Sequence, residues 1–273
     1  MADDLLLNRS LYFIGLLMLV SLFLVTEVGY RIGRRHGKET SIAERREKTV
    51  GTITGAMLAL LGFMLAISLS MADQHFQDRR KLVLEEANAL GTSYLRAQAV
   101  GGPHGAQIAS LLKDYAQLRL DFFAAGEDRN RLKTVYEQTT VMQKRIWDQA
   151  SAVSTGAPTP ISALLLTSLN QVFDLSTSRR WALEVRVPPY VIKLLFGFSF
   201  LAMVMLGYYF GICGVRHPIL SSFLLLAFTA AILLIMDLNR PRSGLIQPEQ
   251  SPIVWVLEDM KHSSASAGVP IHQ

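Results

Sequence analysis

The most densely charged stretch of the chain, residues 73–98, is where chemistry would be expected first. It reads "DQHFQDRRKLVLEEANALGTSYLRAQ", with a basic triplet followed by the adjacent carboxylates Glu85 and Glu86. Paired carboxylates can divide general acid and general base roles when they face one another. Consecutive helical residues point about 100° apart, so Glu85 and Glu86 cannot form such a pair within one chain. The pattern is more typical of a solvated helix face than of an active site.

The rest of the chain offers no alternative catalytic motif. The six histidines are scattered, and no two share metal-ligand spacing on one helix. The chain contains no GxSxG, no Walker loop, no GxGxxG after a strand and no HExxH. We therefore expect no enzymatic activity, no metal and no cofactor. Cys213 is the only cysteine, which excludes an internal disulfide, and no basic stretch interleaved with aromatic residues suggests a nucleic-acid partner.

The composition points instead to the lipid bilayer as the environment of the chain. Half of the 273 residues are hydrophobic and only 18% are charged. The apolar residues cluster in four runs, which are Leu11–Val25, Val50–Met71, Val191–Cys213 and Ile219–Met236. A membrane-spanning helix needs about 20 such residues. We expect an all-α integral membrane protein with four transmembrane helices, spanning the bacterial plasma membrane several times.

The remaining residues predict a helical extramembrane domain between the second and third membrane helices. The expected boundaries are 1–71 for the first helix pair with its basic connecting loop, 72–189 for the helical domain, 190–238 for the second pair and 239–273 for the tail. Pro160 marks a helix start within the helical domain. Ser251 and Pro252 predict a short helix in the tail, which either lies at the membrane interface or packs on the helical domain.

The second membrane helix carries a stripe of small residues. Its members recur at intervals of three and four, and they are Gly51, Gly55, Ala59, Gly62, Ala66 and Ser70. Small residues let helix backbones approach closely within a membrane. The stripe predicts packing against another helix of the same chain, or a face that contacts a second subunit or lines a pore.

A separate apolar line on the same helix consists of Phe63, Ile67 and Met71. If several copies assembled with this helix at the axis, these side chains would form stacked apolar rings that could gate by excluding water. Ordinary contact with lipid or with the core is the alternative.

Beyond the membrane, the helix is expected to continue with two opposing stripes. The polar stripe is Lys81, Glu85, Asn88, Thr92 and Arg96, and the apolar one is Val83, Ala87, Leu90, Tyr94 and Ala97. The basic triplet, Arg79, Arg80 and Lys81, predicts either an anchor to lipid headgroups or a pore mouth that concentrates anions. At the end of the fourth run, Asp237 and Arg240 are candidates for reaching the same membrane level, where Asp237 would form an ion pair with this triplet.

Two blocks carry a family resemblance: "LLGFMLAISLSMADQHFQDRRKLVLEEANALGTSYLRA" and, some 140 residues later, "DLNRPRSG". Together they resemble a bestrophin-like family of bacterial and plant membrane proteins. A more distant resemblance to bestrophins implies a pentameric anion channel whose second membrane helix lines a narrow neck. Gly62, Phe63 and Phe76 match the spacing of the bestrophin neck. Gly55 and Ala59 are smaller than the bestrophin residues, which implies a wider neck, and no acidic cluster resembles a calcium clasp.

The side of the membrane that the helical domain occupies is left open. The loop 31–48 carries seven Lys and Arg residues, which favours a cytoplasmic loop and therefore a domain outside. The bestrophin resemblance implies a cytoplasmic domain.

For function we expect an oligomeric anion channel, with the lipid bilayer, further copies of the chain and inorganic anions as partners. The alternative is a non-conducting scaffold or sensor whose 72–189 domain binds a partner.

Overall fold

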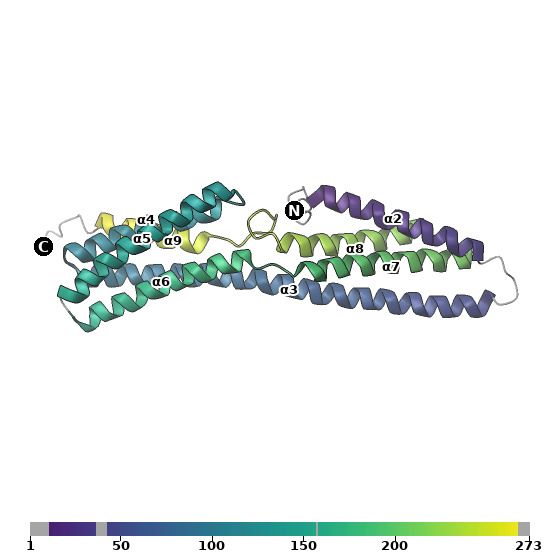
Figure 1. Ribbon diagram of the computed structural model, residues 1–273, viewed down its shortest axis with the longest axis horizontal. Helices are drawn as coiled ribbons and strands as arrows, with labels where there is room; N and C mark the ends of the chain where they lie inside the picture. Colours follow the sequence, from purple (N-terminus) through teal and green to yellow (C-terminus); the bar gives the residue numbers. More distant parts are fainter. Residues whose placement is uncertain (1–10, 37–42, 157, 267–273) are drawn as a thin grey trace. The chain divides into compact units, whose positions relative to one another are not determined.

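The computed structural model describes residues 11–36, 43–156 and 158–266 and consists of helices joined by short connections (Figure 1). Residues 37–42 of the predicted basic loop lie outside this range. The helices are α2 (Leu11–His36), α3 (Ala43–Val100), α4 (Gly102–Ala124), α5 (Arg129–Gly156), α6 (Pro160–Glu184), α7 (Pro189–Cys213), α8 (Pro218–Leu238) and α9 (Ser251–Ser266). The described residues include no strand. The all-α prediction is therefore confirmed.

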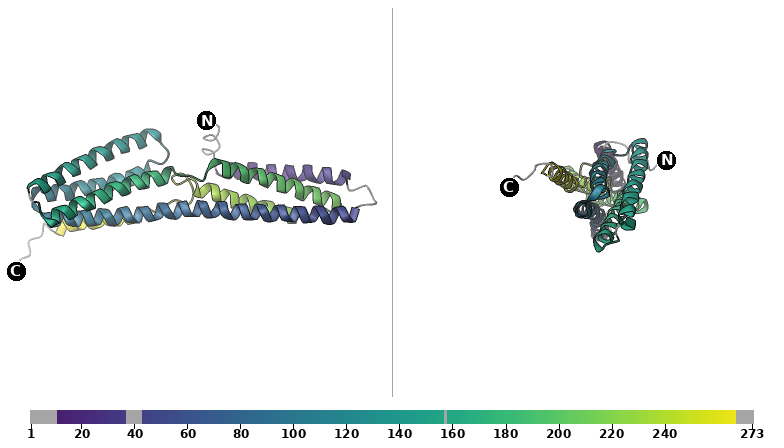
Figure 2. Two further views of the ribbon diagram at one scale, coloured as in Figure 1. Left: turned by 60° about the horizontal axis from the view of Figure 1, so that its bottom comes forward. Right: turned by 90° about the vertical axis from the view of Figure 1, so that its left-hand side faces the viewer.

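The contacts divide the chain into two units. Unit 1 comprises residues 1–74 and 186–239, and unit 2 comprises residues 75–185 and 240–273. α3 runs unbroken for 58 residues and contributes to both units (Figure 2). No glycine or proline interrupts it between residues 63 and 90, which is consistent with one continuous helix.

Unit 1 contains the apolar segments. Four helical segments, one within each of Leu11–His36, Arg46–Val100, Pro160–Cys213 and Pro218–Leu238, are long and apolar enough to cross a membrane, as predicted. Only 17–33% of each apolar window is buried within the chain. Most of this apolar surface therefore faces outward, as expected for helices that contact lipid or other subunits.

The closest helix packing in unit 1 joins α2 and α7. A Cβ atom added to Gly29 or Gly33 of α2 would overlap the α7 backbone, and one added to Gly207 or Gly211 of α7 would overlap the α2 backbone. Glycine is required at these positions because the two backbones themselves are in contact. At the end of α7, Gly214 adopts a left-handed conformation with φ 71°, which ends the helix.

Unit 2 packs the second part of α3 with α4, α5, α6 and α9 (Figures 1 and 2). The predicted apolar stripe of α3 is buried throughout its length, which confirms its role in the core. The predicted start of α6 is also confirmed, because Thr159 caps it and Pro160 is its first residue. The Thr159 hydroxyl accepts a 3.2 Å hydrogen bond from the Ser162 amide, and the Thr159 amide donates to the Ser162 hydroxyl at 2.9 Å.

The tail helix α9 resolves one alternative that the sequence left open. Ile253, Leu257 and Met260 are buried in the same core cluster as Leu90 of α3. The Tyr94 hydroxyl also donates a 3.0 Å hydrogen bond to the Met260 carbonyl. α9 therefore packs on the helices of unit 2, while Trp255 lies on its exposed side.

Candidate functional site

The membrane segment of α3 presents an open face made mostly of small residues. Phe63 and Ile67 are 62% and 46% exposed, and Ala59, Ala66 and Ser70 are exposed beside them. Met71 is half-buried. This face combines part of the predicted small-residue stripe with two members of the predicted apolar line.

The glycines of the stripe separate into two groups. A Cβ atom at Gly55 or Gly62 would meet nothing within 4 Å, whereas one at Gly51 would lie 3.0 Å from the Tyr209 ring of α7. Packing within the chain therefore accounts for Gly51 alone. No other helix in the described part of the chain covers the small residues of the stripe from Gly55 onward.

Further along α3, the polar stripe is only partly solvent-facing. Lys81, Asn88 and Thr92 are exposed, and the Lys81 ammonium lies 3.7 Å from the half-buried Glu85 carboxylate. Arg96 is half-buried and donates a 2.8 Å hydrogen bond to the Leu164 carbonyl of α6. Arg96 therefore tethers α3 to α6 within unit 2.

The basic triplet does not behave as one cluster. Arg80 and Lys81 are exposed, but Arg79 is only 2% exposed. Its guanidinium donates to the carbonyls of Ala182 at 2.9 Å and Val185 at 2.7 Å. These carbonyls lie at the C-terminal end of α6, where helical partners run out and a positive charge is favourable. The expectation of a headgroup anchor or pore-mouth charge therefore does not describe Arg79, because its side chain is buried and engaged within unit 2.

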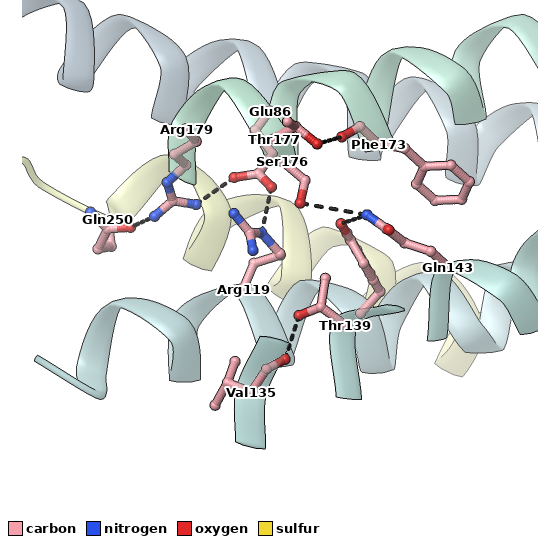
Figure 3. Close-up of polar contacts among 11 residues, drawn as sticks. Glu86, Arg119, Val135, Thr139, Gln143, Phe173, Ser176, Thr177, Arg179 and Gln250 are labelled. Atoms are coloured by element: carbon pink, nitrogen blue, oxygen red, sulfur yellow. Dashed lines mark hydrogen bonds and ion pairs between the residues drawn. The ribbon is translucent and has the colours of Figure 1, made fainter. Parts of the chain in front are cut away.

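A buried charge cluster lies next to Arg79 along α3 and was not anticipated from the sequence. Glu86 is fully buried, and Arg119 of α4 and Arg179 of α6 both bind its carboxylate (Figure 3). The Arg119 Nε lies 2.5 Å from Glu86 Oε1, and Arg179 binds Oε2. The solvated-face interpretation is therefore wrong for Glu86. One carboxylate joins three helices of unit 2.

Neighbouring polar groups complete the cluster. Arg179 also donates to the Gln250 side-chain oxygen (Figure 3). Gln143 donates to the Tyr115 hydroxyl at 3.0 Å. Burial lowers the pKa of Arg179, while the Glu86 carboxylate beside it acts in the opposite direction. The burial of Glu86 could have been inferred from its spacing, because it lies three residues after Val83 and four before Leu90, on the apolar side of α3.

The predicted ion-pair residues at the end of the fourth run are both buried. Asp237 belongs to unit 1 and Arg240 to unit 2. The ion pair between Asp237 and the basic triplet stays a prediction, as does the placement of Arg240 at the same membrane level. Within the described ranges, no group of three or more His, Cys, Asp or Glu side chains is arranged to hold a metal ion.

Known protein families and solved structures share this architecture. The model of the Bestrophin-like domain matches residues 17–253. A crystal structure of a single-site mutant of a bacterial Bestrophin homolog from Klebsiella pneumoniae has a TM-score of 0.70 and 13% identity, covering 94% of this chain and 99% of that one. Another structure of the Klebsiella pneumoniae homolog has a TM-score of 0.62 and 17% identity, covering 96% of this chain and all of that one.

At these identities the structural likeness concerns the fold alone. No curated protein sequence matches the chain significantly. The match of the domain model covers most of the chain, including both sequence blocks that carried the resemblance. The chain therefore belongs to the bestrophin-like family.

Proposed function

We propose that this chain assembles as a homo-oligomer around the open face of α3 and conducts inorganic anions across the membrane. The observation that carries the proposal is the exposed run of small residues around Phe63. Gly55 and Gly62 have no neighbour within 4 Å of an added Cβ, and Ala59, Ala66 and Ser70 are exposed. Small residues in a membrane helix permit close approach of another backbone, and here a second copy of α3 would supply it. The family resemblance suggests five copies.

In such an assembly Phe63 and Ile67 supply the apolar constriction. Both side chains are large and exposed on a face that is otherwise small. A ring of such side chains narrows an aqueous path and disfavours water, which is a recognised means of gating. Gly55 and Ala59 leave the path wider at their own level, because neither has a bulky side chain.

Anion preference follows from the charges beyond the constriction. Arg80 and Lys81 are exposed on α3, and Asn88 and Thr92 add exposed polar groups further along. A ring of several copies multiplies each positive charge and concentrates anions at the entrance. The exposed side chains of this part of α3, which are Arg80, Lys81, Asn88 and Thr92, would therefore line an anion-attracting vestibule.

Cysteine crosslinking tests the assembly directly, because Cys213 is the only native cysteine. In a Cys213→Ser background, Phe63→Cys is expected to give disulfide-linked dimers in native membranes upon mild oxidation. Phe223→Cys is the matched control, since Phe223 is a similarly exposed phenylalanine on α8 (68%). Crosslinking at position 223 but not at 63 would contradict the placement of α3 at the axis.

Conductance is tested separately with purified protein in liposomes. Chloride efflux above that of protein-free liposomes is expected. An oligomer crosslinked through α3 that carries no flux of any ion would reject the channel and favour the scaffold or sensor alternative.

A further inference from the structure

Two arginine side chains of unit 2 stack on one buried aromatic ring, that of Phe122. The Arg119 and Arg242 guanidinium carbons lie 4.6 and 4.5 Å from the centre of the Phe122 ring. Arg179 is close by, since it shares the Glu86 carboxylate with Arg119. Two guanidinium groups therefore share one buried carboxylate, and a third, that of Arg242, stacks on the same ring as Arg119. The nearby Glu127 carboxylate lies on the surface and accepts a 2.7 Å hydrogen bond from the Ser243 hydroxyl.

Several N–H groups of this cluster are buried without an acceptor. Arg242 donates from Nη1 to the Gly126 carbonyl at 3.3 Å, but its Nε and Nη2 have no hydrogen-bond partner. The Nη2 of Arg119, whose side chain is only 2% exposed, also lacks one. A buried donor without an acceptor is unfavourable, and more so when it is charged. The region therefore has an excess of both positive charge and hydrogen-bond donors.

We propose that a small oxyanion of the phosphate or carboxylate class binds unit 2 at the Nε–Nη2 edge of Arg242 and at Nη2 of Arg119, beside the Phe122 ring. The Nε–Nη2 edge of arginine presents two parallel donors that match two oxygens of a carboxylate or phosphate. Arg242 leaves unpaired the two donors that such an oxyanion uses. A halide has only one acceptor atom and cannot give each donor an oxygen of its own, so this site favours oxyanions and differs in specificity from the proposed conduction path.

The position of Arg242 in the chain suits a ligand-dependent contact. It lies between α8 and α9, in a segment that is not helical, and it contacts the turn after α4 through Gly126. The Arg119 side chain comes from a helix and is fixed by Glu86. An oxyanion would therefore bridge one fixed arginine and one loop arginine, and its binding would stabilise the docking of the loop.

Intrinsic fluorescence isolates this unit in the full-length protein, because Trp147, Trp181 and Trp255 are the only tryptophans and all belong to unit 2. We expect the fluorescence-detected Tm of the detergent-solubilised protein to rise saturably with inorganic phosphate and with acetate, at an ionic strength held constant with sodium chloride. Exchanging chloride for another halide should leave Tm unchanged. A Tm that responds equally to chloride would overturn the proposal, since it would reflect charge screening alone.

The test variant is Arg242→Lys, which keeps the positive charge and removes the two-donor edge. Its half-saturating phosphate concentration is expected to rise at least tenfold. Arg180→Lys is the matched control, because Arg180 also stacks on a ring, 3.9 Å from the centre of Tyr136, and is about half exposed. Its phosphate response should equal that of the unmodified protein. An unchanged response in Arg242→Lys would refute the assignment of the site.

A direct binding measurement on the unmodified protein tests the site even if the Arg242→Lys variant fails to fold. Equilibrium dialysis of the unmodified protein with radiolabelled phosphate should show saturable binding that acetate displaces and chloride does not. Absence of saturable binding would reject the site whatever the variants do. None of these measurements depends on ion conduction, so their failure would leave the channel proposal untouched.

Discussion

Arg119 Nε of α4 lies 2.5 Å from Glu86 Oε1 of α3, and both side chains are almost completely buried. Arg179 of α6 holds the second oxygen of the same carboxylate. Removing one partner of a buried ion pair leaves the others charged and unpaired, which is far more destabilising than the loss of an exposed pair.

The first prediction concerns that carboxylate. Glu86→Ala is expected to destabilise unit 2 by about 3–5 kcal/mol, because two buried arginines lose their shared partner. Thermal or denaturant unfolding followed by tryptophan fluorescence measures this. Glu85→Ala is the neighbouring control, and its exposed pair with Lys81 should contribute no more than about 0.5 kcal/mol. Equal effects of the two substitutions would show that Glu86 does not hold the helices together.

A second prediction tests the α2–α7 contact. Gly207→Ala is expected to destabilise unit 1 by about 1–3 kcal/mol or more, since the new methyl group overlaps the Thr26 carbonyl oxygen. Circular dichroism of the detergent-solubilised protein during heating reports the loss of helix. Gly197→Ala on the same helix meets nothing within 4 Å and should be neutral or slightly stabilising. Equal Tm values for the Gly207→Ala and Gly197→Ala proteins would show that the α2 and α7 backbones are not in contact.

The third prediction rests on the proposed channel. Phe63→Ala should raise chloride flux several-fold in liposomes, because a ring of large apolar side chains is replaced by a wider and wetter path. Phe223→Ala on α8 removes an equally exposed ring and should leave the flux unchanged. Equal flux through the Phe63→Ala protein and the unmodified protein would mean that the constriction lies elsewhere.

Charge selectivity provides a fourth prediction. Lys81→Glu should shift the reversal potential toward cation permeability, because each subunit then places a negative charge at the vestibule. The control is Lys133→Glu on α5, where the lysine is similarly exposed but is not part of the α3 face. Bilayer recordings under a salt gradient measure the shift. An anion preference that survives Lys81→Glu would remove residue 81 from the conduction path.

The fifth prediction concerns alkaline pH. Burial raises the pKa of Tyr115 above its ordinary value of 10.0; the Glu86 charge acts in the same direction, and Arg119 opposes it. Because the folded state holds this proton more tightly than the unfolded state, stability should be full below about pH 10 and fall as the pH rises further. Tyr115→Phe should weaken the fall in Tm, and Tyr190→Phe, which removes an exposed hydroxyl in unit 1, should not.

Much of the fold followed from the sequence because it depends on local periodicity. Hydrophobic runs of membrane length predicted the four spanning helices, and helical spacing predicted which side of α3 is buried from Val83 to Ala97. The start of α6 was predictable because proline is favoured at the first position of a helix, where its backbone nitrogen needs no hydrogen-bond partner. The open face of small residues was visible as a pattern, but whether another helix of the chain covered it was not.

The tertiary structure alone decided which charged residues are buried. Glu86 and Arg79 lie in the same charged stretch as the exposed Arg80 and Lys81, and composition does not separate them. Arg119, which binds Glu86, is 33 residues further along the chain. The two carbonyls that Arg79 binds, at the C-terminal end of α6, are 103 and 106 residues further along. The same residue type can carry a solvated charge or a buried, paired one. Only the helices that pack over the side chain in the folded protein determine which of the two it is.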